Sequence, residues 1–390
     1  KYSNCRINVG QTLFSLVQIV AMNWIVVSVA YFAALNGMSS YYPQRHRRSL
    51  QRSRYLQLYG ICHNLLVLLG LPVLLHDLFT QNPNARAQVQ SPLIRLINII
   101  FGVFKVLLIV SCVYCANRLQ TPIRRMFEKL QSMDKRCWTT AAPRELHVLL
   151  FVKLVFVVVH VALQLSFFVS RLASSPAFYL WGSLWRLTTN NMISAASLLA
   201  FLLLWQTCRC NLALQSRLEQ LLRRRAQPEQ VHDLLLQQQQ LILIIGDFCG
   251  IFDHILFWDL LCTAFTGIQS GYYLIRILFG RRHSHLSLKT AITIASVVFH
   301  SLAEFYIVNF LAGVVEDLKE RTNCILRRCR PQFESIERTT AWMMLQMSFQ
   351  STKIQIFGFG TLNRSLVFNV MAQIVAHTLY MIQHDYEDVM

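Results

Sequence analysis

The chain has 390 residues, of which 54% are hydrophobic, and its mean hydropathy is +0.39. This composition is too apolar for an ordinary soluble protein of one or two domains and predicts a membrane protein. The formal charge of +18 would suggest a nucleic-acid-binding protein in a soluble chain, but here Lys and Arg are divided among short segments between apolar runs. We therefore interpret the charge as a topology signal and expect no nucleic-acid partner.

The first 53 residues are predicted to form a cytoplasmic N-terminal segment. They contain an apolar stretch at residues 12–35 and a basic cluster at Arg45–Arg48. The apolar stretch is long for a signal peptide, and the basic cluster follows it where a cleavage site would have small residues. We expect it to pack on the protein or lie at the membrane interface, with a spanning helix as the alternative. Because the first residue is Lys1, we also expect the native start to be missing.

Seven later stretches are long and apolar enough to cross a bilayer, which takes about 20 residues. They are residues 54–79, 92–117, 147–170, 182–207, 254–279, 290–315 and 365–383. The predicted fold is therefore an all-α polytopic membrane protein with seven transmembrane helices.

Lys and Arg divide the intervening segments into two groups. One group holds 26 of these residues and the alternate group holds 5. The basic group is 1–53, 118–146, 208–253 and 316–364, and the other is 80–91, 171–181, 280–289 and 384–390. Because cytoplasmic loops are enriched in Lys and Arg, the N-terminus is predicted inside and the C-terminus outside. This orientation is opposite to that of a G-protein-coupled receptor.

Two predicted cytoplasmic segments carry helical periodicity and are too long for simple connectors. Residues 208–253 keep helical Leu spacing up to Pro228 and resume it afterwards. After residue 316 a helix is expected to stop before Pro331, and a further amphipathic helix to end near Gly358. Their apolar faces must pack on something, so the sequence predicts a helical cytoplasmic layer.

The cysteines indicate packing rather than a disulfide framework. None of the 11 lies in a predicted external loop. Cys112 and Cys115 fall inside the second predicted span, where packing is the favoured interpretation. Cys208 and Cys210 are expected at the cytoplasmic end of the fourth span, where palmitoylation is a hypothesis.

Seven spans with an internal N-terminus, cytoplasmic extensions of the fourth to sixth spans, and a last span that closes on an apolar run and Gln383 are found together in this chain. In this architecture, and in part of its C-terminal sequence, the chain resembles the insect gustatory receptors. The segment "RRSLQRSRYLQLYGICHN" also looks like some members. That family ends its last span on Thr-Tyr, five apolar residues and Gln-Phe. Here the sequence reads Ala376, His377, residues 378–382, Gln383 and His384, so the Gln and the apolar middle match.

The resemblance implies a tetrameric, ligand-gated, non-selective cation channel that detects taste compounds. It implies a plasma-membrane location in sensory neurons, a small-molecule tastant, contact with membrane lipids, and a homo- or heterotetramer with related subunits, with no requirement for a G protein. The implied parts are a six-helix ligand-binding domain at 54–315, anchor helices at 316–363, a pore helix at 364–383 and an extracellular tail at 384–390.

By the same resemblance the last span would line the pore. The implied pore residues are Ala376, His377, Tyr380, Ile382, Gln383 and His384. Two family aromatics are histidines here, so either conduction depends on pH through their titration or the gate lies elsewhere on the helix.

The tail raises a question of its own, because this basic chain ends on Asp385, Glu387 and Asp388. In four copies around one axis these carboxylates would form an external charge ring that concentrates cations. A solvated tail without a role is the alternative.

Ionisable residues within the spans need partners or functions, since a charge at mid-bilayer costs ~2.5 to 3.5 kcal/mol. Counting about 1.5 Å per residue from the span ends matches the depth of Lys105 with Glu304, and that of Lys153 with Asp259. We predict these two ion pairs, with ligand contacts as the alternative. His300 shares a helix face with Glu304, four residues away.

An outward-opening ligand pocket is expected among polar and aromatic residues in the outer half of the spans. The candidates are His160, Gln164, Arg186, Asn190, Tyr272, Tyr273 and Arg276.

Other functional classes have weaker support. His254 and Asp259 have the H-x4-D spacing of acyltransferases, but on a helix they lie roughly 140° apart, so an enzyme is not expected. A transporter would show related halves, which the sequence lacks. An odorant receptor subunit is the nearest alternative. No metal or cofactor is expected, since His283 and His285 have no further ligands beside them.

Overall fold

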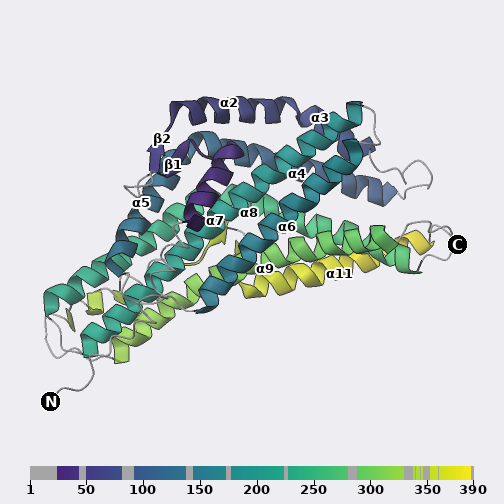
Figure 1. Ribbon diagram of the computed structural model, residues 1–390. Coiled ribbons are helices and arrows are strands. Elements are labelled where there is room, and N and C mark those ends of the chain that lie inside the picture. Colours follow the sequence, from purple (N-terminus) through teal and green to yellow (C-terminus); the bar gives the residue numbers. More distant parts are fainter. Residues whose placement is uncertain are drawn as a thin grey trace, which may run out of the picture.

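The computed structural model consists mostly of long helices packed against one another at oblique angles (Figure 1). It describes residues 24–43, 50–80, 92–137, 144–172, 177–223, 227–279, 288–328, 337–338, 340–342, 344–345, 352–358 and 360–387. Its elements are β1 (Tyr41–Pro43), β2 (Leu50–Arg52), α2 (Arg54–Leu69), α3 (Leu71–Thr80), α4 (Pro92–Arg118), α5 (Gln120–Cys137), α6 (Arg144–Leu172), α7 (Ala177–Arg223), α8 (Pro228–Phe279), α9 (Leu288–Arg328), β3 (Gln355–Ile356), β4 (Gly360–Thr361) and α11 (Arg364–Glu387).

Six helices within the described residues are long and apolar enough to span a membrane, and each contains a predicted span. They are α4, α6, α7, α8, α9 and α11. The fold is therefore that of a helical multi-pass membrane protein, as the hydropathy predicts. The first predicted span, residues 54–79, instead forms two helices, α2 and α3, which meet at Gly70.

The break between α2 and α3 is the place where Trp185 of α7 packs. A Cβ atom on Gly70 would lie 0.8 Å from Nε1 of that indole, so only glycine leaves room for the ring. Pro72, the second residue of α3, has no N–H for a continuous helical ladder, which also favours a break here. A hydropathy profile shows neither the packing of Trp185 on Gly70 nor the missing N–H of Pro72.

Part of the N-terminal apolar stretch is described, as a helix over Trp24–Leu35. Val29 and Ala33 are buried, and they face Phe127 of α5 and Leu202 of α7. The described part thus packs on the bundle, which is the favoured interpretation from the sequence, while residues 12–23 lie outside the described residues.

The helix α7 forms the centre of the main core, since every residue from Ala200 to Cys208 is buried. The indole of Trp205 donates a 2.7 Å hydrogen bond to the carbonyl of Leu146 on α6, which satisfies its one buried polar group.

The residues predicted to form a cytoplasmic helical layer belong to the extended ends of α7, α8 and α9, which pack on one another. As predicted, α7 and α8 are separate helices: α7 ends at Arg223 and α8 begins at Pro228, where the missing N–H has no intrahelical partner to lose. A separate apolar cluster joins these ends. Its buried members are Leu214, Leu218, Val231, Leu234, Leu235, Ile242 and Leu326. The helix α9 ends at Arg328, before Pro331, also as predicted.

Buried amides hold these ends in register. Nε2 of Gln215 donates to the carbonyl of Leu318 at 2.6 Å and to the hydroxyl of Thr322 at 2.7 Å. Nε2 of Gln238 donates to Oδ1 of Asn211 at 2.8 Å. Such a network requires one relative placement of the three helices, because any shift would leave buried polar groups unpaired.

The prediction of an amphipathic helix up to Gly358 is wrong in its C-terminal part. Residues 352–354 are not helical, and β3 pairs antiparallel with β4 around a turn at Phe357 and Gly358. Burial alternates from Thr352 to Ile356, a period of two that the sequence already contains. Both turn residues have positive φ, 47° and 68°, which no helix accommodates.

The palmitoylation hypothesis is also contradicted by packing. Cys208 and Cys210 are fully buried, and their thiols lie 3.8 Å and 3.7 Å from the carbonyls of Leu311 and Leu130. Cys112 and Cys115 are buried in the main core, as the packing interpretation expects.

Candidate functional site

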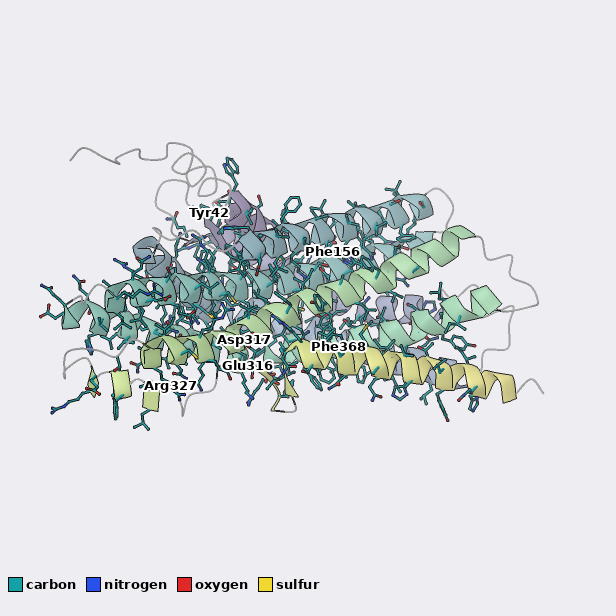
Figure 2. The ribbon with its side chains drawn as sticks, turned by 90° about the horizontal axis from the view of Figure 1, so that it is seen from below. Tyr42, Phe156, Glu316, Asp317, Arg327 and Phe368 are labelled. Carbon is teal, nitrogen blue, oxygen red and sulfur yellow. The ribbon has the colours of Figure 1, made fainter. Side chains whose placement is uncertain are left out.

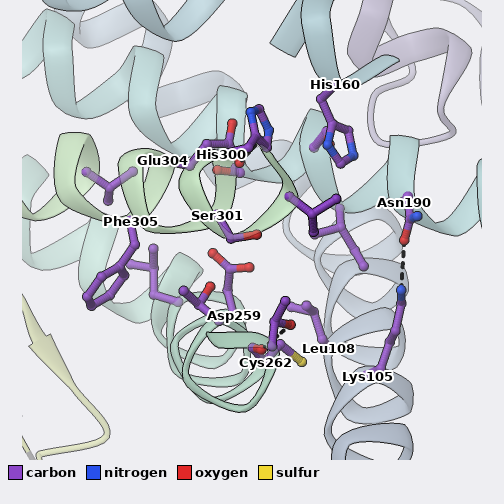
Figure 3. A pocket seen from close by; sticks show the side chains of 18 of the residues that line it. Lys105, Leu108, His160, Asn190, Asp259, Cys262, His300, Ser301, Glu304 and Phe305 are labelled. Carbon is purple, nitrogen blue, oxygen red and sulfur yellow. Dashed lines mark hydrogen bonds and ion pairs between the residues drawn. The ribbon is translucent and has the colours of Figure 1, made fainter. Parts of the chain in front are cut away.

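A cavity of ≈ 340 Å³ lies between α4, α6, α7, α8 and α9. Figure 3 shows charged and hydroxyl side chains from these helices converging on it. Its size is at the lower end for small-molecule sites, which are usually apolar with a few placed polar groups. Here four ionisable residues, Lys105, Arg186, Asp259 and Glu304, are among those that line it.

Four of the residues predicted to bind a ligand line this cavity: His160 and Gln164 of α6, and Arg186 and Asn190 of α7. Tyr272 and Tyr273 lie elsewhere, in a cluster with Ile374 and Met381 of α11, because their faces of α8 are turned towards that helix. The side chain of Arg276 is outside the described residues.

The four ionisable residues singled out within the spans are close together, but the predicted pairing is wrong. Nζ of Lys153 lies 2.8 Å from Oε1 of Glu304 and 3.1 Å from Oγ of Ser197. Lys105 instead donates to Oδ1 of Asn190 at 2.8 Å, and Asp259 lies on the cavity wall. The prediction paired residues by their depth in the membrane, counted along helices taken as straight. The actual helices cross at angles that bring α6 against α9 at this level.

Two histidines form the wall beside this ion pair. The rings of His160 and His300 stack at 4.9 Å with an interplanar angle of 16°, and Nε2 of His300 lies 3.9 Å from Oε2 of Glu304. Phe156 packs against His300 at 5.3 Å between centroids. The predicted sharing of one face by His300 and Glu304 is confirmed.

The last helix, α11, runs along an outer edge of the bundle in two perpendicular views (Figures 1 and 2). Among its side chains up to His384, which the structure describes, one stripe is buried: Val367, Ile374, Thr378 and Met381. Two α8 glycines permit this close packing, since a Cβ on Gly267 would lie 2.7 Å from Ile374 and one on Gly271 would lie 3.0 Å from Thr378.

The residues of α11 predicted to line a pore are mostly on its uncovered side. Ala376, His377, Tyr380 and Gln383 are exposed, while Ile382 and His384 are half-buried. Of the tail carboxylates, Asp385 and Glu387 continue the helix without described side chains, and Asp388 lies outside the described residues.

Opposite the buried stripe, α11 has a row of small and polar residues. At about 100° per residue, these positions lie within roughly 40° of the direction away from the bundle. They are Ser365, Asn369, Ala372, Ala376 and Gln383, and all are exposed. An adjacent apolar flank contains Phe368, which is 70% exposed and is labelled in Figure 2, and Val375, which is 56% exposed.

One residue connects the cavity to α11 directly. Leu362 lines the cavity, and its N–H donates to the carbonyl of Ile354 at 2.8 Å. The next residue, Asn363, caps the helix by accepting the N–H of Leu366 at 3.0 Å. The sequence pattern does not indicate this role, because Leu362 is one of many apolar residues in the chain.

A second connection joins α8 to the turn before α11. The carboxylate of Asp253 accepts the N–H of Phe357 at 2.5 Å, and the ring of Phe357 packs edge-on against His254 at 4.6 Å. His254 is exposed, whereas Asp259 lines the cavity. The two residues of the H-x4-D pattern therefore do not form one site.

Comparison with known families agrees with this architecture. The family model of the 7tm chemosensory receptors matches residues 28–388. The chain belongs to the 7tm chemosensory receptor family. Among curated chemosensory receptors it is similar to the Drosophila melanogaster protein named "Putative gustatory receptor 85a", with 27% identity over 373 residues, which cover 92% of each chain.

Solved structures share the chemosensory receptor fold. The olfactory receptor OR5 of Machilis hrabei superposes with a TM-score of 0.65 at 10% identity, and its complex with eugenol with a TM-score of 0.61 at 13% identity. Each comparison covers 94% of this chain and 99% of the other. At these identities the likeness concerns the fold.

Proposed function

We propose that this chemosensory receptor is a gustatory receptor subunit: a non-selective cation channel, opened by a small tastant, that assembles as a homo- or heterotetramer with related subunits. The observation that carries the proposal is the uncovered side of α11. A helix at the edge of a bundle that faced only lipid would be apolar outward, yet this one has Ser365, Asn369 and Gln383 there.

Four copies arranged around an axis would satisfy both parts of that surface. The row of small and polar residues would face a water-filled path, and the apolar flank with Phe368 and Val375 would pack on the neighbouring copy or on lipid. Polar groups along such a path coordinate water and ions without an unpaired group in hydrocarbon. Because the chain itself would form the conduction path, no G protein is required.

The cavity is the proposed tastant site. It is lined by polar residues from five helices of the 54–315 region, and Leu362 joins its wall to the start of α11. If Leu362 can take two positions, a ligand that binds more tightly with one of them would shift the equilibrium towards it. Because Leu362 precedes α11, this shift would also favour one position of α11. The olfactory receptor OR5 has been solved with eugenol, which supports a small-molecule ligand here.

Taste is proposed over odour because the curated relative that aligns over 92% of this chain is named a gustatory receptor, whereas the olfactory receptor similarity is one of fold. The corresponding location is the plasma membrane of sensory neurons. Residues 316–363 would act as the subunit anchor, 364–383 as the pore helix and 384–390 as an extracellular tail.

Cysteine accessibility tests the pore. Ala376→Cys and Gln383→Cys, expressed in cells that lack other receptors, are treated with a charged methanethiosulfonate reagent during whole-cell recording. We expect both variants to lose current, because their side chains would face the ion path. Ile374→Cys on the buried stripe is the matched control and should be unaffected. Current that survives modification at both positions would contradict a pore along α11.

A further inference from the structure

The cavity contains hydrogen-bond acceptors that have no donor. Asp259 of α8 lines it, and within the described part of the chain its carboxylate accepts no hydrogen bond and forms no ion pair. A carboxylate kept away from bulk water without a partner is costly, so such a group indicates a missing counterpart.

Asn309 of α9 provides the second acceptor. Its side chain is fully buried and lines the same cavity. Nδ2 donates to the carbonyl of Phe305 at 2.8 Å, and because a carbonyl only accepts, this bond determines which way the amide faces. Among the described residues, Oδ1 has no hydrogen-bond partner.

The cations in and beside the cavity each have at least one partner. Lys153 is bonded to Glu304 and Ser197, and Lys105 to Asn190. Arg186 also has an interaction partner. Among the described residues, Nε of Arg186 and Nε2 of His300 have no hydrogen-bond partner, but each of these three cations has at least one partner, whereas the carboxylate of Asp259 has none. A positively charged hydrogen-bond donor beside Asp259 would supply that missing partner.

We propose that the ligand is a small organic amine, whose ammonium group is held by Asp259 and reached by Asn309 Oδ1. An ammonium carries several N–H donors, which suits two acceptors on adjacent helices. Phe101 and Phe305 line the cavity and supply aromatic faces for the rest of the molecule. The nearby cations Lys105 and Arg186 disfavour a second positive charge, so the remainder of the ligand is neutral or anionic.

The inference rests on the proposed tastant site and deepens it by naming the ligand class. Its test uses binding to the purified full-length protein, so it does not depend on channel activity. The probes are three pairs with the same carbon skeleton: benzylamine and benzyl alcohol, phenethylamine and phenethyl alcohol, and hexylamine and 1-hexanol. In at least one pair we expect the protonated amine to bind tighter than its alcohol by on the order of 10- to 100-fold.

Asp259→Asn keeps the size of the side chain and removes its charge, so it should abolish the preference for the amine. Asp247→Asn is the matched control on the same helix, because Asp247 is exposed and lies 3.9 Å from Lys129, away from the cavity. If Asp259→Asn elutes as aggregate, the wild-type pairs still decide the question. Asn309→Asp, which adds a second carboxylate, should increase the amine preference.

The outcomes separate this inference from the proposed function. Amine-selective binding without any evoked current would support the amine site and count against the channel. Currents evoked by other compounds, with no amine preferred over its alcohol in any pair, would overturn the amine site and leave the channel standing. Equal preference in wild type and Asp259→Asn would overturn the role of Asp259.

Discussion

Lys153 and Glu304 are 151 positions apart in the chain, yet Nζ of one lies 2.8 Å from Oε1 of the other. The lysine side chain is 0% exposed and the glutamate side chain 22% exposed. The pair joins α6 to α9 at the level of the cavity, and Ser197 of α7 accepts a further hydrogen bond from the same ammonium. A charge buried this deeply is tolerated because its partner and hydrogen bonds replace water.

Removing one member of this pair should destabilise the protein more than removing both. Glu304→Gln leaves the Lys153 ammonium without its counter-charge, at a cost of about 3–5 kcal/mol. Thermal unfolding in detergent, followed by size-exclusion elution, should show a lower Tm for Glu304→Gln and for Lys153→Met, with partial recovery in the double variant. Additive losses in the double variant would mean that the two residues do not depend on each other.

Gly70→Ala should disrupt the packing of α3 on α7. The new Cβ would overlap the indole of Trp185, so one of the two helices must move. We expect a lower Tm and reduced surface expression. Gly246→Ala in α8 is the control, since no atom lies within 4 Å of a Cβ there and alanine favours a helix interior by roughly 0.5–1 kcal/mol. Equal behaviour of the two variants would exclude a steric role for Gly70.

The turn before α11 should affect gating. Asp253→Ala removes the acceptor of the Phe357 N–H, a bond worth about 0.5–1.5 kcal/mol, while the backbone at Phe357 remains in its uncommon φ region. We expect the half-activating ligand concentration to shift severalfold with little change in maximal current. Asp247→Ala on the same helix should leave the dose response in place, and an unchanged response in Asp253→Ala would rule out this contact as part of gating.

The terminal carboxylates should raise conductance at low ionic strength. Replacing Asp385, Glu387 and Asp388 with Asn, Gln and Asn removes the proposed external charge ring, so single-channel cation conductance should fall in dilute salt. The difference should shrink near 1 M salt, where the screening length is about 3 Å. Equal conductance of both channels in dilute salt would assign no role to the ring.

The orientation predicted from Lys and Arg has its own test. An epitope tag after Met390 should be labelled by antibody on intact cells, because the C-terminus is expected outside. A tag at the N-terminus should require permeabilisation. The reverse pattern would place the carboxylates in the cytoplasm and remove the basis for an external ring.

The sequence by itself located the six long apolar helices. Hydropathy located the spans in α4, α6, α7, α8, α9 and α11, and proline marked the helix boundary at Pro228. These features follow from local chemistry: about 20 apolar residues satisfy a bilayer, and a residue without an N–H ends a helical ladder. Four ligand candidates also proved to share one cavity, since polar residues in apolar helices tend to face the protein interior.

Only the tertiary structure decided which residues meet. Depth along each helix favoured Lys105 as the partner of Glu304, whereas the crossing of α6 and α9 made it Lys153. The break at Gly70 depends on Trp185, a residue 115 positions later. The sequence also does not predict that Asp259 lacks a partner. Whether a charged side chain has a partner depends on how five helices are rotated and crossed, and a local sequence pattern contains no information on this.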